Sequence, residues 1–159
     1  MGLALSGACI VTNIAGASAP NAEPNHFGRG IVGTWQVKVS LHDCTSGVQI
    51  GMPFDSLLTF ADGGTLTETT ANAMFHPAVR SGGHGYRNRD SRSRYTAATL
   101  AYVTANGALT RIQKITRSIV MGPNPDEFSV PRADIRFFDP AGNPLMTGCA
   151  SAVAVRFDG

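Results

Sequence analysis

The sequence predicts an all-β protein that folds as an antiparallel, up-and-down barrel of eight strands. Its 159 residues include 18 glycines and 9 prolines, and its Val, Ile, Thr and aromatic residues fall in short runs, as is typical of strands joined by many turns. No apolar repeat of 3.6 residues is sustained for long, which argues against a helical fold. Successive hairpins favour a meander, and closure into a barrel removes its exposed edges. A β-sandwich is the alternative architecture.

The first strand is expected over residues 32–44. Apolar side chains occupy every second position from Trp35 to Leu41, with polar side chains between them, which is the period of a strand with one buried face. An eighth, short strand is expected near residues 83–88. The other six strands are expected as three hairpins, which pair residues 54–60 with 64–71, 94–104 with 108–120, and 128–138 with 144–157.

Turn residues mark the ends of these three hairpins. The first has Asp-Gly-Gly at residues 62–64, the second has Asn106-Gly107, and the third has Asp-Pro-Ala-Gly-Asn at residues 139–143. Asn-Gly and Asp-Gly are strong signals for a tight hairpin because both tolerate a positive φ. Pro131 cannot donate a backbone hydrogen bond, so its run is expected to be an edge, to contain a bulge or to start late.

The N-terminal segment, residues 1–19, carries no charged side chain and ends in Ala-Ser-Ala, a pattern that signal peptidase cleaves. We therefore expect a signal peptide and an exported protein, periplasmic or extracellular; an apolar N-terminal arm is the alternative. The segment is too short and too often interrupted by polar residues to span a membrane permanently. Residues 20–30 are expected to form a flexible lead-in, and residues 31–159 a single barrel domain.

Removal of the signal peptide would leave two cysteines, Cys44 and Cys149. An even count in an exported domain favours one disulfide. Cys44 ends the first strand and Cys149 sits in the last, and those two strands are neighbours in a closed meander. Closing a loop of roughly 100 residues would stabilise the fold by up to about 4–5 kcal/mol in the chain-entropy model. Two free thiols are the alternative.

Gly33-Thr34-Trp35, at the start of the first strand, resembles the G-x-W signature of the lipocalin and calycin barrels. The resemblance implies a calycin-like barrel in which Arg156, near the end of the last strand, stacks on Trp35. The chain is also similar to a group of small exported bacterial lipocalin-like proteins whose function is largely uncharacterised. That similarity rests on TFADGGTLTE, GHGYRN, QKITRSI and FFDPAGNPLMTGCASAVAVRF. Where the group has a tryptophan after its Gly-His-Gly, this chain has Tyr86 nearby.

The longest connection is expected over residues 71–94, as a loop above the mouth of the barrel. Long loops on a rigid scaffold often carry function, and we expect His84 to act there. The connection also contains five arginines that could hold an anionic ligand. The alternative is a solvated loop whose arginines point to water. These arginines are Arg80, Arg87, Arg89, Arg92 and Arg94.

Two further sites carry charged or amide groups on strands. Glu68 shares a strand face with Leu66, so if Leu66 points into the barrel, Glu68 does too. An inward carboxylate could act as a general acid or base with His84 or a tyrosine. The alternatives are that Glu68 faces solvent or forms a buried structural pair. Arg111 and Gln113 share a face with Arg117, and such buried polar groups need a partner in Glu68, water or a ligand.

We expect a barrel that binds a small, partly apolar molecule in its interior. A cyclase or isomerase is the first alternative, because barrels of this shape resemble allene oxide cyclases and polyketide cyclases; a structural module with a filled interior is the second. The net charge of +2 gives no case for nucleic acid as a partner, and no cofactor or metal is expected, since the histidines are dispersed. The ligand-binding candidates are Tyr86, Tyr95, Arg111 and Gln113; the catalytic candidates are Glu68 and His84; the structural candidates are Trp35, Arg156, Cys44 and Cys149.

Overall fold

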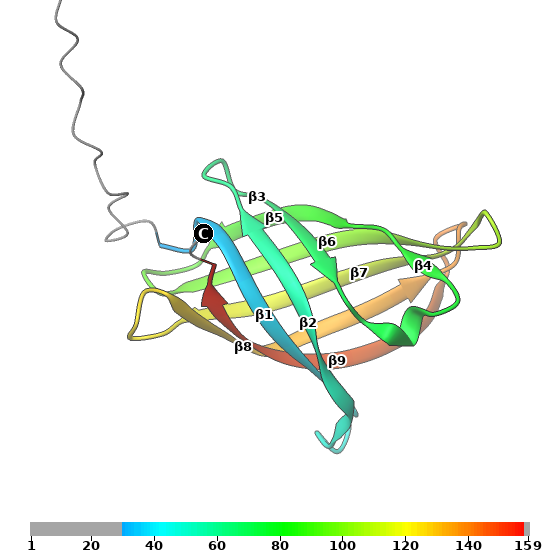
Figure 1. Cartoon of the computed structure of the whole chain (residues 1–159), viewed down its shortest axis with the longest axis horizontal. Helices are drawn as coiled ribbons and strands as arrows, with labels where there is room; N and C mark the ends of the chain where they lie inside the picture. Colours follow the sequence, from blue (N-terminus) through cyan, green and yellow to red (C-terminus); the bar gives the residue numbers. More distant parts are fainter. Residues whose placement is uncertain (1–29, 158–159) are drawn as a thin grey trace, which may run out of the picture.

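Eight antiparallel strands wrap obliquely into a closed barrel in the computed structural model, which describes residues 30–157 (Figure 1). Strands that follow one another along the chain pair with one another, and β1 pairs with β9 to close the barrel. The predicted all-β, up-and-down architecture is therefore confirmed. The strands are β1 (Gly33–His42), β2 (Gln49–Phe60), β3 (Thr65–Thr70), β5 (Gly83–Arg89), β6 (Arg94–Ala105), β7 (Ala108–Met121), β8 (Glu127–Phe138) and β9 (Pro144–Arg156).

The expected strand limits agree closely with the observed ones, except that β2 begins at Gln49 rather than at Phe54. Asn106 and Gly107 both have positive φ, 51° and 77°, as an Asn-Gly turn of type I′ requires. The register between β8 and β9 shifts between Val130 and Ala133, so of the three alternatives for Pro131 (an edge, a bulge or a late start) the structure has the bulge. The expected signal peptide, and the lead-in before Gly30, lie outside the described residues.

A packed core fills one end of the barrel, which we call the closed end. Trp35, Phe60 and Phe128 are at most 3% exposed there. The Trp35 and Phe128 ring centroids lie 4.8 Å apart, and those of Phe60 and Phe128 lie 6.2 Å apart at 76°. Tilted and edge-to-face pairs of this kind add to the free energy gained by burial. These side chains pack against one another and fill the barrel interior at this end.

Arg156 seals the closed end. Its guanidinium carbon lies 4.2 Å from the centroid of the Trp35 ring, the stacking that the resemblance implied. The same guanidinium donates to Asp126 Oδ1 at 2.6 Å and to the backbone oxygens of Gly30 and Val32 at 2.9 and 2.7 Å. A cation on an aromatic face with its donors satisfied is a stable buried arrangement. Arg156 thus joins the ends of β1 and β9.

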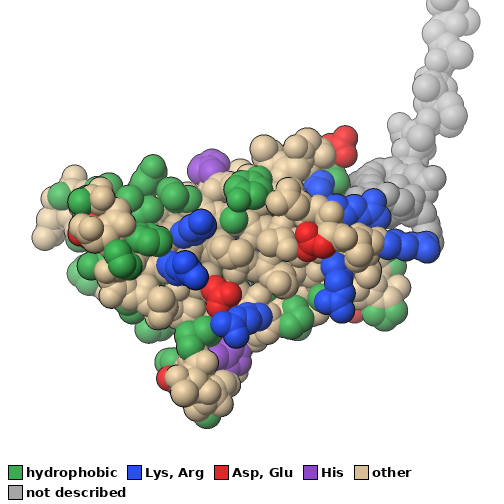
Figure 2. Space-filling model, turned by 180° about the vertical axis from the view of Figure 1, so that it is seen from behind, with side chains coloured by type: hydrophobic (Ala, Val, Ile, Leu, Met, Phe, Trp, Pro, Cys, Tyr) green, Lys and Arg blue, Asp and Glu red, His purple; other side chains and the backbone are tan. Residues whose placement is uncertain are grey.

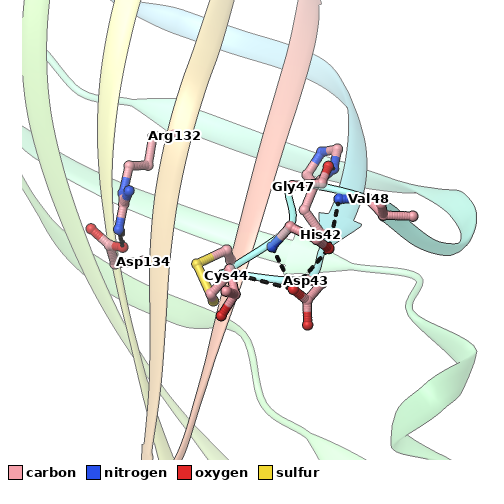
Figure 3. Close-up of a disulfide and its surroundings, with 10 residues drawn as sticks. His42, Asp43, Cys44, Gly47, Val48, Arg132 and Asp134 are labelled. Carbon is pink, nitrogen blue, oxygen red and sulfur yellow. Dashed lines mark hydrogen bonds and ion pairs between the residues drawn. A yellow bond between two sulfur atoms is a disulfide. The ribbon is translucent and has the colours of Figure 1, made fainter.

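A disulfide joins Cys44 to Cys149 at the opposite end, which we call the open end (Figure 3). The Cα atoms are 5.2 Å apart, within the range that a disulfide spans, and 105 residues separate the cysteines along the chain. His42, two residues before Cys44, pairs with Cys149 across β1 and β9, so the barrel closure itself brings the two sulfurs together. A structural disulfide is typical of an oxidising compartment.

The short eighth strand expected near residues 83–88 is confirmed as β5 (Gly83–Arg89), a full strand of the barrel wall between β3 and β6. The expected loop over residues 71–94 is therefore wrong in its second half. Gly85 makes this pairing close: a Cβ at that position would lie 1.8 Å from the backbone oxygen of Ala98. Only residues 71–82 cross the open end, and they contain the 3₁₀ turn η1 (Ala73–Phe75) and the two-residue strand β4 (Val79–Arg80), which pairs with the end of β6.

Candidate functional site

A cavity of about 310 Å³ occupies the half of the barrel toward the open end. Successive side chains of each strand point alternately to the outside and to the inside of the barrel. The inward side chains form the wall of the cavity. On β9 those inward residues are Ala150 and Ala152, whose small side chains leave the space open. The apolar part of the wall comprises Val37, Val39, Leu41, Ile50, Phe54, Leu58, Ile115, Val130, Ile135 and Phe137.

A buried polar cluster forms one side of this cavity, and Glu68 is its centre. The side chain of Glu68 is 6% exposed. Arg80 Nη2 donates to its Oε1 at 3.0 Å, while Thr99 Oγ1 donates to its Oε2 at 2.9 Å. Arg117 Nη2 also donates to Oε2, and to Thr99 Oγ1 at 2.8 Å. The carboxylate therefore has two guanidinium partners and one hydroxyl partner inside the barrel.

The surroundings of Glu68 keep it ionised. Burial by itself raises the pKa of the carboxyl, but the charges of Arg117 and Arg80 and the hydrogen bonds from Arg117 and Thr99 outweigh burial and hold the pKa below its usual range. For Arg80, burial lowers the pKa of the guanidinium, and the nearby charge of Arg117 adds to that lowering, whereas Glu68 opposes it. A carboxylate in this state accepts hydrogen bonds and has no proton to give.

Arg80 links the segment across the open end to the barrel wall. Besides its contact with Glu68, its Nε donates to Gln113 Oε1 on β7 at 2.5 Å. Its guanidinium carbon lies 6.0 Å from the ring centroid of Phe75 in η1, and that ring lies 6.5 Å from the ring of Phe137 on β8. Residues 71–82 thus cover part of the cavity through contacts with two sides of the barrel.

The rim of the open end is apolar as well. In Figure 2, hydrophobic side chains gather at the left, which is the open end, while lysines and arginines are more frequent toward the other end. A contiguous exposed apolar patch of this kind is typical of a binding surface. Its exposed members are Val48, Ile50, Met52, Met74, Val79, Tyr102, Leu109, Leu145 and Met146.

Three of the residues expected at the site line the cavity: Glu68, Arg111 and Gln113. The guanidinium carbon of Arg111 lies 5.7 Å from the ring centroid of Phe137. Gln113 is 5% exposed and accepts the hydrogen bond from Arg80. The alternation along β3 and β7 that predicted inward side chains at these positions is therefore observed.

The other three expected residues lie elsewhere. His84 and Tyr86 are exposed on the outer face of β5, because Gly83 and Gly85 take the alternate, inward positions. His84 therefore does not meet Glu68, which pairs with Gly83 across β3 and β5. Tyr95 is 4% exposed in the closed-end core, outside the cavity lining.

The sequence named Arg80 only among five arginines that could hold an anionic ligand, and Arg117 only as a neighbour of Arg111 and Gln113 on one strand face; neither was among the expected site residues. For Arg117 the signal was present, because it shares the inward face of β7 with Arg111 and Gln113. Arg80 carried no such signal, since it belongs to a segment whose path across the open end follows from no sequence period. In addition, no three His, Cys, Asp or Glu side chains within residues 30–157 converge so as to hold a metal ion.

The sequence comparisons identify no relative: no protein-family model matches the chain, and none of the curated proteins compared with it is significantly similar. Within the described part of the chain, no helix is long and apolar enough to cross a membrane.

Proposed function

We propose that this protein binds a small, mostly apolar molecule inside its barrel. The observation that carries the proposal is the 310 Å³ cavity, which has an apolar wall and one buried polar cluster. Ligand sites are usually concave and apolar with a few placed polar groups, and their volumes run from about 300 to 1,000 Å³. The cavity lies at the lower end of that range, so the ligand is small.

The contacts of Glu68 support binding over catalysis. An acid or base must exchange a proton with the substrate, so its carboxyl needs a free oxygen and a pKa near the working pH. Both oxygens of Glu68 already accept hydrogen bonds from Arg80, Arg117 and Thr99, and its pKa is lowered. In our proposal Glu68 holds the two arginines in place, and the barrel performs no cyclisation.

Two further parts of the proposal concern family and location. Gly33-x-Trp35 with Arg156 stacked on the tryptophan supports a lipocalin-like assignment. The disulfide between Cys44 and Cys149 supports export to an oxidising compartment, periplasmic or extracellular.

The test is uptake of N-phenyl-1-naphthylamine, an uncharged apolar dye whose fluorescence rises in an apolar site. The wild-type protein should bind one dye molecule saturably. Ala152→Phe puts a ring into the cavity and should weaken uptake at least about tenfold. Val153→Phe is the matched control, because Val153 is the next residue of β9 and is 63% exposed on the outer face; it should bind like the wild type. Absence of saturable uptake by the wild type, or equal uptake by Ala152→Phe, would contradict the proposal.

A further inference from the structure

The charges that line the cavity do not balance. Arg80, Arg111 and Arg117 supply three guanidinium groups, whereas Glu68 supplies one carboxylate. The wall therefore carries a formal charge of +2, from three positive groups and one negative, with His42 counted as neutral. Buried charges are usually paired, because removing an ion from water is costly unless a partner compensates for it. An apolar cavity with this excess favours a negatively charged occupant.

Several hydrogen-bond donors of the cavity wall are also left without an acceptor in the described part of the chain. Gln113 uses its Oε1 for Arg80, and its Nε2 has no acceptor among residues 30–157. Arg117 donates only through Nη2 in this part of the chain, which leaves Nε and Nη1 without acceptors. Thr70 Oγ1 is buried and has no partner among the described residues. The cavity thus offers unused donors on Gln113 and Arg117, while the carboxylate in its lining, Glu68, is already occupied.

Arg111 is the arginine that is most available to a ligand. Arg80 and Arg117 both contact Glu68, whereas Arg111 contacts the ring of Phe137 and has no carboxylate partner among the described residues. An arginine that lies on an aromatic ring is held in place and can still donate two parallel hydrogen bonds to a carboxylate. Gln113, two residues along the inward face of β7, lies on the same side of the cavity.

We propose that the ligand is a small carboxylate with an apolar body, whose carboxylate group is bound by Arg111 and the amide of Gln113. The apolar body of the ligand lies against the apolar wall of the cavity. The positive charges of Arg80, which donates to Gln113, and of Arg117 also favour a negatively charged ligand. This inference rests on the proposed function, and it adds the charge class of the ligand. A neutral ligand of the same shape leaves the donors of β7 without acceptors, so it binds more weakly.

The test compares octanoate with 1-octanol, which have chains of equal length and differ in the charged group. Each is titrated into the full chain at pH 7 and low salt by isothermal calorimetry. Octanoate should bind at least about tenfold more tightly than 1-octanol. Arg111→Gln should remove most of this preference. Lys114→Gln is the matched control, because it removes the same charge from an outward position of β7, three residues after Arg111; it should keep the preference.

Each outcome decides a separate point. If 1-octanol binds as tightly as octanoate, or if Arg111→Gln and Lys114→Gln behave alike, the carboxylate proposal is wrong, while the apolar cavity still functions as a binding site. If neither compound binds and the uncharged dye is also excluded, the proposed function is wrong as well. The comparison of the two compounds on the wild-type protein requires no variant, so it holds even if Arg111→Gln fails to fold.

Discussion

Replacing Glu68 by glutamine tests the electrostatic account of the site. Glu68→Gln keeps the size of the side chain and removes its charge. Arg80 and Arg117 then face each other inside the barrel without the carboxylate that both contact, at 3.0 Å in the case of Arg80. The amide can accept a hydrogen bond from one guanidinium, but it cannot compensate for two positive charges.

The expected cost follows from the burial of these groups. The side chains of Glu68, Arg80 and Arg117 are 6%, 4% and 6% exposed, so solvent screens their charges only weakly. Removing one partner of a buried ion pair costs about 3–5 kcal/mol of unfolding free energy, because the remaining charge is left uncompensated. That is a large fraction of the 5–15 kcal/mol by which a typical domain is stable. Adding Arg117→Met to Glu68→Gln removes one of the two charges and should recover about half of the loss.

Urea unfolding followed by circular dichroism measures this effect. With an m-value of about 2 kcal/mol/M, Glu68→Gln should lower the unfolding midpoint by about 2 M. The matched control is Asp134→Asn, because Asp134 forms an ion pair with Arg132 on the surface, where the side chains are 46% and 69% exposed. An exposed pair contributes about 0–1 kcal/mol. The reasoning fails if Glu68→Gln unfolds within 1 kcal/mol of the wild type, or no earlier than Asp134→Asn.

Four further predictions concern stability. The pKa of Glu68 is lower in the folded than in the unfolded chain. Ionised Glu68 therefore contributes fully to the unfolding free energy above the unfolded pKa of about 4.3, and this contribution is lost as the pH falls below that value. In Glu68→Gln the unfolding free energy should accordingly decrease less steeply at acidic pH than in the wild type. Reduction of Cys44–Cys149 should cost about 2–5 kcal/mol and expose two new thiols in a thiol titration. Arg156→Ala should destabilise the protein by several kcal/mol in urea and leave dye uptake by the folded protein unchanged. Gly85→Ala should reduce thermal stability strongly, since its Cβ would overlap a backbone oxygen of β6; an unchanged melting temperature would contradict the close β5–β6 approach.

The barrel was predictable because its signals are local. Alternation from Trp35 to Leu41 and the Asn106-Gly107 turn each determine short-range geometry, and both appear in the structure as expected. The pairing of Cys44 with Cys149 followed from closure of the meander, which makes the first and last strands neighbours. These inferences needed only the period of a strand and the rule that a barrel has no edges.

Two of the misplaced residues, His84 and Tyr86, have the same cause. Glycine carries no polarity signal, so the sequence did not show that Gly83 and Gly85 occupy the inward positions of β5 and turn His84 and Tyr86 outward. For a related reason, the sequence did not predict the contacts of Arg80, which it named only as one of five arginines that could hold an anion. Its guanidinium reaches Glu68 and Gln113 only because residues 71–82 cross the open end, and that path depends on tertiary packing and not on any repeat in the sequence.

The central claim is that a ligand lies inside the barrel, and methyl-selective NMR of the protein with octanoate and with 1-octanol tests it most directly. We predict intermolecular nuclear Overhauser effects from the ligand chain to the methyl groups of Ile115 and Ile135, which line the cavity. The methyl groups of Ile119, in the closed-end core, should show none. Contacts confined to the exposed Val153 and Val155 on the outer face of β9, or no contacts with either compound, would contradict the account.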